Sequence, residues 1–111
     1  MLSHRKVGAV TVAAFQDNVL DQSNARYAER LLTALVGPGS KIVLDLGRAE
    51  WMDSSGCCTL ITLLKRLKEA GGALKLCALT PPVRTLFELM RLHRIVDVYN
   101  TADEALRAFG G

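Results

Sequence analysis

The stretch KIVLDL, residues 41–46, constrains the fold more than any other part of this sequence. It is short and mostly apolar, and its apolar residues do not alternate with polar ones. Such a run is typical of a strand that is covered on both faces. Helical patterns of apolar residues come before and after it along the chain. A doubly covered strand between two helices indicates an α/β fold with a mainly parallel sheet.

The remaining patterns predict further strands and helices in alternation. We expect two strands within residues 2–15 with Gly8 between them, then helix 24–36, strand 41–46, a central helix after Trp51 that stops at Gly71, strand 73–79, a helix started by Pro81, strand 95–99, and a closing helix after Thr101. The polar first strand suits a sheet edge. The order ββαβαβαβα predicts one domain, residues 1–111, with a small mixed, mainly parallel sheet, an edge hairpin strand and four helices.

Helical spacing predicts which side chains of these helices are buried. On the first helix, one face carries Tyr27, Ala28, Leu31, Leu32 and Leu35. On the central helix, the predicted core face carries Cys57, Leu60, Ile61, Leu64 and Leu67, and the outer face carries Cys58, Thr59, Thr62, Lys65, Arg66 and Glu69. The predicted core includes Ile42, Leu44, Leu60, Leu64, Leu86 and Phe87.

Composition and charge exclude several classes of protein. Half of the residues are hydrophobic, which excludes a disordered chain. No apolar run approaches the roughly 20 residues that span a bilayer. Arg5 and Lys6 precede any sustained apolar region, so we expect no signal peptide and a cytoplasmic location. The net charge of +3 is spread along the chain and only 5% of residues are aromatic, so direct nucleic-acid binding is not expected.

The three cysteines do not have the spacing of a metal site. Cys57 and Cys58 are adjacent, and Cys77 follows much later in the chain. An odd number in this arrangement indicates reduced thiols in a cytoplasmic protein. We therefore predict no metal and no cofactor, with one of the adjacent cysteines in the core and the other exposed.

The turn DSSG, residues 53–56, opens directly onto the central helix and has two interpretations. Ser and Asp side chains accept hydrogen bonds from free N–H groups at a helix start, so Ser54 or Ser55 could simply be the helix cap. The same N–H groups and the helix dipole also suit a phosphate, so a serine hydroxyl could instead be presented for modification. From the residues alone both interpretations stay open. The turn lies in a loop after a strand, where α/β folds usually place functional groups.

A serine hydrolase is a third hypothesis, from a different class of function. The sequence has no Gly-x-Ser-x-Gly motif, and its only histidines are His4 and His93. It also lacks a glycine-rich phosphate loop that ends in Lys-Ser or Lys-Thr. We therefore expect a chain without catalytic activity of its own.

Residues 41–109 carry a resemblance to a known family. KIVLDLGRAEWMDSSG, the following helix, its Gly-Gly stop and the Pro-started helix together resemble the STAS domain of bacterial anti-sigma factor antagonists. Residues 1–40 match only in the order of their elements. Leu20 and Asp21 stand where the family usually has a Gly-x-Leu-Asp turn.

The resemblance implies a protein-binding module that is controlled by phosphorylation. In that family an unphosphorylated antagonist binds an anti-sigma factor that is also a serine kinase, and a sigma factor is released. The kinase phosphorylates the serine after the aspartate, which here is Ser54. The implied partner-binding residues are Asp21, Asp53, Ser54, Ser55, Gly56 and Cys58.

One departure concerns the partner surface. The family motif commonly continues Gly-Leu-Gly, whereas Gly56 is followed here by Cys57 and Cys58. Cys58 places a side chain where a small residue normally allows close approach. An alternative within the same fold is a stressosome-like or other scaffold that is phosphorylated or binds a nucleotide without acting on a sigma factor.

Overall fold

A five-stranded mixed sheet forms the centre of the computed structural model, which describes residues 2–110. Its strands, in spatial order, are β1 (Leu2–Val7), β2 (Val10–Phe15), β4 (Lys41–Asp45), β6 (Ala73–Cys77) and β7 (Asp97–Tyr99). β1 and β2 form an antiparallel hairpin, and every other pair in this sheet is parallel. Gly8 turns the hairpin with a positive φ of 61°, which glycine adopts without steric cost. The mixed sheet with β1 at its edge confirms the predicted architecture.

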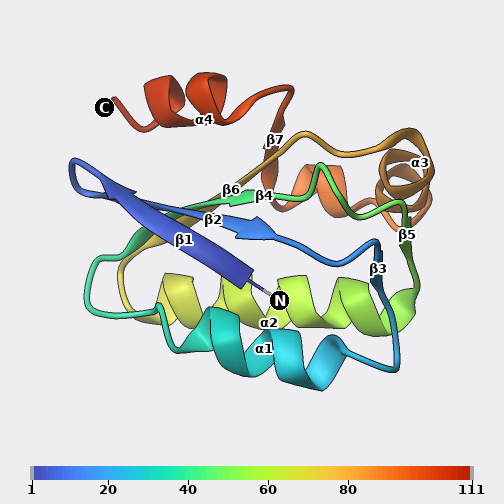
Figure 1. Cartoon of the computed structure of the whole chain (residues 1–111). Helices are drawn as coiled ribbons and strands as arrows, with labels where there is room; N and C mark the ends of the chain where they lie inside the picture. The colour runs from blue at the N-terminus through green and yellow to red at the C-terminus, as the bar shows by residue number, and fades with distance from the viewer. Residues whose placement is uncertain (1, 111) are drawn as a thin grey trace.

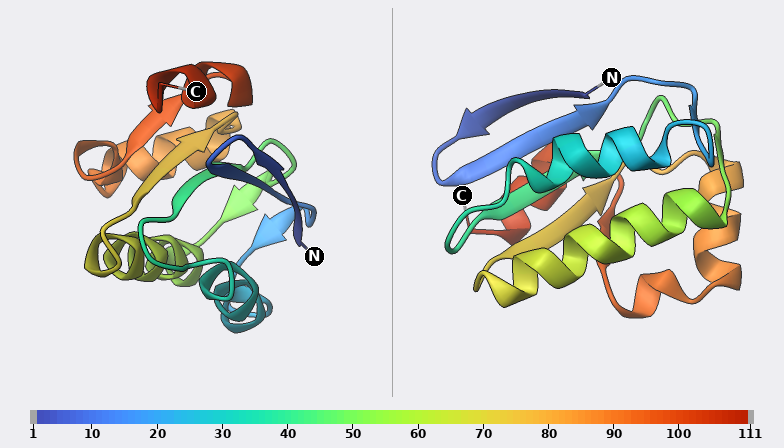
Figure 2. Two further views of the ribbon diagram at one scale, coloured as in Figure 1. Left: turned by 90° about the vertical axis from the view of Figure 1, so that its left-hand side faces the viewer. Right: turned by 90° about the horizontal axis from the view of Figure 1, so that it is seen from below.

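The helices cover the two faces of the sheet unequally (Figures 1 and 2). α1 (Ala25–Thr33) and α2 (Ser54–Glu69) pack side by side on one face, and α4 (Ala102–Ala108) covers part of the other. α3 (Pro81–Leu89) lies at the end of the sheet and is followed by a short 3-10 helix, residues 92–94. The four α-helices within residues 2–110 agree with the prediction from the sequence.

The surroundings of β4 explain why its three central residues are all apolar. Ile42 and Leu44 are at most 1% exposed and belong to the core under α1 and α2. Val43, between them, is fully buried in a second cluster with Ala105 and Leu106 of α4. Because both faces of β4 are covered, neither face can carry a polar side chain without a partner.

A two-stranded parallel ribbon, which sequence patterns did not predict, lies beside the main sheet. It pairs β3 (Val19–Leu20) with β5 (Trp51–Met52). The two strands lie within the segments that we expected to be loops before α1 and before α2. The ribbon fixes the start of both helices relative to each other (Figure 1).

Several predicted boundaries and faces were wrong. α1 ends at Thr33 rather than Val36, and its buried face is formed by Ala25, Ala28 and Leu32. Tyr27 is half exposed, at 50%. β7 begins at Asp97, because the preceding residues turn through the 3-10 helix.

The buried face of α2 is wider than the predicted stripe. Thr59, expected on the outer face, is only 4% exposed, and Leu63 is fully buried. Ile61 is half-buried rather than core. The reason is that α2 packs against α1 as well as the sheet, so two sides of the helix are covered. Leu86 is also half-buried, while the other five predicted core residues are buried.

Candidate functional site

Asp53 links the start of α2 to the loop before α1. It is the N-cap residue of α2 with extended backbone, and its Oδ1 accepts hydrogen bonds from the N–H groups of Ser55 at 2.9 Å and Gly56 at 3.2 Å. Its Oδ2 accepts a third from the N–H of Gln22 at 3.2 Å. One carboxylate therefore satisfies two free amides of the helix and one of the neighbouring loop.

The cap position excludes one of the two interpretations of the serines. Because Asp53 caps the helix, the interpretation of Ser54 or Ser55 as the cap is wrong. Ser54 is the first residue of α2 and is exposed, whereas Ser55 is half-buried. The Ser54 hydroxyl thus lies on the surface at the positive end of a 16-residue helix.

Gly56 allows the start of α2 to pass against the β3–β5 ribbon. A Cβ atom at this position would lie 2.5 Å from the carbonyl oxygen of Leu20 and 2.6 Å from Cγ of Met52. Gly56 is buried, and the N–H of Asp53 donates to that same Leu20 carbonyl at 3.3 Å. Any side chain would therefore push the helix start away from the ribbon.

Asp21 lies in the loop that Asp53 contacts, and its carboxylate accepts hydrogen bonds from a residue of that same loop. The hydroxyl and N–H of Ser23 both donate to Asp21 Oδ1, at 2.5 and 2.9 Å. These bonds, with that from the Ser23 hydroxyl the largest cause, lower the pKa of Asp21. The N-cap residue of α1 is Asn24, whose side chain makes no capping hydrogen bond. Asn24 Nδ2 instead donates to the Val19 carbonyl at 2.8 Å.

A hollow of ≈ 350 Å³ lies between the first turns of α1 and α2. It is lined by Gln22, Ala25, Arg26, Glu29, Ser54, Ser55, Cys58 and Thr59. Ser54, Ser55 and Cys58 thus share one surface. Gly56 lies beneath it in the core, and the carboxylate of Asp21 lies in the adjacent loop. The α1 side of the hollow was not predicted, because nothing in the local pattern indicates which helix lies beside α2.

The three cysteines differ in their surroundings. Cys57 and Cys77 are fully buried, and burial raises the pKa of Cys57 to about 11 and that of Cys77 to about 12. Both thiols therefore stay protonated near neutral pH, and thiols in that state are poor nucleophiles. Cys58 is exposed on the surface that carries Ser54. One adjacent cysteine in the core and one exposed is the arrangement that the sequence predicted.

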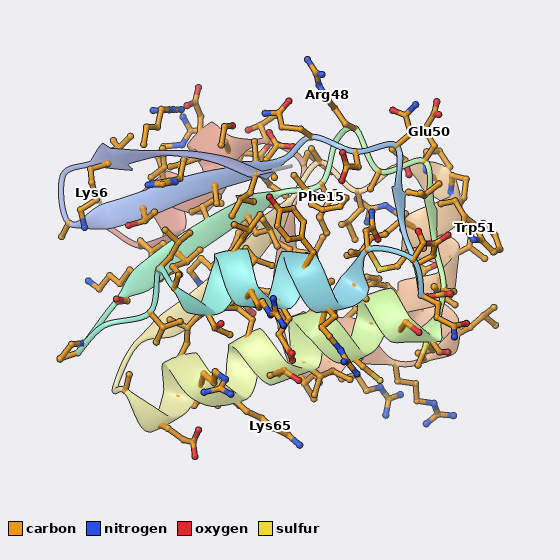
Figure 3. The ribbon with its side chains drawn as sticks, turned by 60° about the horizontal axis from the view of Figure 1, so that its bottom comes forward. Lys6, Phe15, Arg48, Glu50, Trp51 and Lys65 are labelled. Atoms are coloured by element: carbon orange, nitrogen blue, oxygen red, sulfur yellow. The ribbon has the colours of Figure 1, made fainter. Side chains whose placement is uncertain are left out.

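An exposed apolar pair adjoins the DSSG turn and was missed by sequence reasoning. Trp51 is 57% exposed and pairs across the ribbon with Val19, which is 36% exposed. Figure 3 shows the Trp51 side chain projecting away from the ribbon. The pair could have been suspected only from a lone tryptophan two residues before Asp53.

The histidines lie away from Ser54. His4 is on β1, and His93 is in the 3-10 helix, where it lines a separate hollow with Arg84 and Tyr99. Neither lines the hollow that carries Ser54, so the described residues place no histidine there as a general base. Within residues 2–110, no cluster of three potential metal ligands occurs. In the same part of the chain, no helix has the length and apolar character needed to cross a membrane.

Comparisons with known proteins give a consistent assignment. The family model for the STAS domain matches residues 4–105. A curated protein named as an anti-sigma factor antagonist, BtrV of Bordetella bronchiseptica, is 35% identical over 97% of this chain and 93% of its own length. An anti-sigma-factor antagonist (STAS) domain protein from Planctomyces limnophilus has a similar structure, with a TM-score of 0.89, 26% identity, and coverage of 99% of this chain and 98% of that one.

The fold also matches the anti-sigma factor antagonist SpoIIAA, which has been solved in two forms. The unphosphorylated form has a TM-score of 0.78 at 23% identity, covering 100% of this chain and 98% of that one. The phosphorylated form, described as a Bacillus cell fate determinant, has a TM-score of 0.72 at 18% identity, covering 98% and 99%. At these identities the likeness is one of fold.

Proposed function

This chain belongs to the STAS domain family, and we propose that it is an anti-sigma factor antagonist whose binding is switched off by phosphorylation of Ser54. In the unphosphorylated state it sequesters an anti-sigma factor that has serine kinase activity, and a sigma factor is set free. The relative BtrV and the similar structure from Planctomyces limnophilus, both described as anti-sigma factor antagonists, support this function. The proposed role is that of a binding module in the cytoplasm, without catalysis, cofactor or nucleic-acid contact of its own.

The observation that carries this proposal is that Asp53 caps the helix while the neighbouring Ser54 does not. Asp53 caps α2, so the hydroxyl of Ser54 is not needed to satisfy the helix start and is exposed. A kinase can therefore reach this hydroxyl without unfolding the turn. The other hydroxyls nearby are less accessible: Ser55 is half-buried, and Thr59 is buried and donates to the carbonyls of Ala25 and Ser55.

The modification itself is a phosphoryl transfer from ATP that the partner kinase catalyses. The Ser54 oxygen forms a bond to the γ-phosphorus, the bond from that phosphorus to the leaving ADP breaks, and a base of the kinase takes the hydroxyl proton. This chain supplies only the acceptor hydroxyl. Asp53 positions it through the cap, and Gly56 holds the helix start against the ribbon.

The phosphate would break the complex without breaking the fold. It adds about −1.5 to −2 charges. In a packed interface the phosphate repels the neighbouring carboxylate of Asp53, and both groups must lose their hydration. At the start of α2 the same phosphate lies at the positive end of the helix dipole, so the folded chain tolerates it. SpoIIAA, which shares the fold, has been solved in a phosphorylated form.

Mass spectrometry after incubation with the host's kinase-like anti-sigma factor and ATP tests the assignment. The kinase is recovered from the native host with the Ser54→Ala protein as bait. We expect one phosphate, on Ser54, and none on the Ser54→Ala variant, with Ser55→Ala as the matched control that is still phosphorylated. A phosphate on Ser55, Thr59 or Thr62 would overturn the assignment. Recovery of scaffold proteins in place of a kinase would favour the stressosome-like alternative.

A further inference from the structure

Arg26 and Ser54 face the same hollow from different helices. Arg26 is in the first turn of α1, and Ser54 is the first residue of α2. The two helices lie side by side (Figure 3), and the first turn of α1 is joined to the second turn of α2 where Thr59 Oγ1 donates to the carbonyl of Ala25 at 3.2 Å. This buried bond fixes the backbone next to Arg26 against α2. The position of α1 against α2 is therefore set by buried contacts and does not depend on Arg26.

The guanidinium of Arg26 has no partner of its own. It is exposed, and within residues 2–110 it forms no ion pair and no side-chain hydrogen bond. The acidic groups around the hollow are Glu29 on α1, Asp53 at the start of α2, and Asp21 in the adjoining loop. The carboxylate of Asp53 accepts from N–H groups of its own turn and of Gln22, that of Asp21 accepts from Ser23, and Cys58 contributes a neutral thiol.

We propose that Arg26 is the intramolecular partner of the phosphate on Ser54, so that phosphorylation forms an ion pair between α1 and α2. This proposal rests on the proposed function, because it assigns the regulation of that same site. The planar guanidinium can donate two parallel N–H bonds to phosphate oxygens, which suits it to phosphate better than a lysine ammonium. The same phosphate would also lie at the positive end of the α2 dipole, which favours a negative charge.

The ion pair gives the switch a second effect beyond added negative charge. In the unphosphorylated chain, Arg26 is free to contact an acidic group of a partner. After phosphorylation the guanidinium is held by the chain's own phosphate, so the same event adds charge beside Asp53 and removes a cation from the binding surface. Glu29 lines the hollow too, but it repels the phosphate, so Arg26 is the one cation among the lining residues that can neutralise it.

The test uses full-length protein with phosphoserine placed at position 54 by genetic encoding, so it needs no kinase. Phosphorus NMR titration measures the second pKa of the phosphate, which is about 6 for an unperturbed phosphoserine. In the wild-type background we expect a pKa lower than in the Arg26→Ala background by roughly 1 unit, because a nearby cation favours the dianion. Arg26→Lys should restore part of the shift. Arg30→Ala, one turn further along α1 and outside the hollow, is the matched control and should leave the pKa unchanged.

Two results would overturn the proposal. One is the same phosphate pKa in the wild-type and Arg26→Ala backgrounds, and the other is an equal change for Arg30→Ala, which would indicate a general effect of net charge. The outcome is independent of whether the host kinase modifies Ser54. Failure of the kinase assay with a shifted phosphate pKa would reject only the proposed function, and the reverse pattern would reject only the role of Arg26.

Discussion

At the scale of single residues, the turn before α2 separates structural from switching roles in adjacent positions. Asp53 makes three hydrogen bonds to backbone N–H groups, and Ser54 presents an exposed hydroxyl. Gly56 permits the close approach of the helix to Leu20. A residue that both capped the helix and accepted phosphate would couple modification to loss of the cap, and this arrangement avoids that coupling.

We predict that Asp53→Ala is clearly destabilising and that Ser54→Ala is not. Loss of the cap should lower the free energy of unfolding by about 1 to 2 kcal/mol. Asp53→Asn keeps an acceptor oxygen and should lose less. Ser54→Ala should stay within about 0.5 kcal/mol of wild type, as exposed substitutions usually do. Urea unfolding of the three variants measures this, and an equal loss for Ser54→Ala would return the capping role to Ser54.

The buried thiols lead to a prediction about reactivity and pH. Near neutral pH, a thiol reagent should modify only Cys58 in the native chain and all three cysteines in the unfolded chain, because Cys57 and Cys77 are fully buried. Their native pKa values, about 11 and about 12, lie above the ordinary value of 9.0. At pH values between the ordinary and the native pKa, the two thiols therefore stay protonated in the native chain, whereas they have lost their protons in the unfolded chain.

The sign of the pH dependence follows from this difference. The stability that the protonated thiols contribute is fully present below pH 9, and it is lost as pH rises toward the native values of about 11 and about 12. Urea unfolding at increasing alkaline pH checks it, with Cys57→Ala as a variant whose decline should be shallower. Native modification of all three thiols at neutral pH would contradict the assigned burial.

At the scale of elements, the β3–β5 ribbon joins the proposed switch to an apolar surface. Val19 and Trp51 pair on its exposed side, and the strand of Trp51 continues directly into Asp53. Tryptophan is enriched among the residues that dominate binding energy at protein interfaces. A partner seated over Ser54 could therefore bury Trp51 in the same contact.

We predict that Trp51→Ala weakens partner binding with little effect on folding. Because the side chain is 57% exposed, its removal should leave the thermal midpoint close to that of wild type. Loss of an anchoring tryptophan costs about 2 kcal/mol or more, which is over tenfold in Kd. Calorimetric titration with the kinase-like anti-sigma factor measures the change. Leu89→Ala, at a 76% exposed position on α3, is the control, and equal losses for both variants would argue against the ribbon as the contact.

At the scale of the whole molecule, the layered fold places the switch at one end of α2 and keeps it separate from the core. Both faces of β4 are buried, by α1 and α2 on one side and α4 on the other. The turn around Ser54 is held by local caps and by the ribbon. A charge added at this end changes the surface and leaves the packed layers intact.

We predict that Ser54→Asp folds like wild type and binds the partner poorly. A carboxylate at a helix N-terminus is favourable by about 0.3 to 1 kcal/mol. In the complex, however, a second negative charge beside Asp53 must lose its hydration, and we expect Kd to rise by at least about tenfold, or 1.4 kcal/mol. Ser54→Ala should bind like wild type and become insensitive to ATP. Calorimetric titration with thermal midpoints measures both, and tight binding by Ser54→Asp would place the switch elsewhere.

Local patterns in the sequence determined the order of the main elements and the position of the DSSG turn. Apolar runs, helical spacing and the stops at Gly8 and Gly71 act over a few residues, so they can be recognised without knowing what packs where. For the same reason residues 41–46 could be predicted to form a strand that is covered on both faces. The exposed and buried members of the Cys57 and Cys58 pair also follow from the helical period alone.

Only the tertiary structure decided which residues act together at the site. The cap belongs to Asp53 partly because Gln22, from a distant segment, donates to the same carboxylate. Thr59 is buried because α1 lies beside α2, which the period of one helix cannot reveal. The ribbon is too short to give a pattern, and Arg26 and Ser54 line one hollow only because two separate helices pack side by side. Contacts between distant segments depend on packing, and packing is a property of the whole fold rather than of any local pattern.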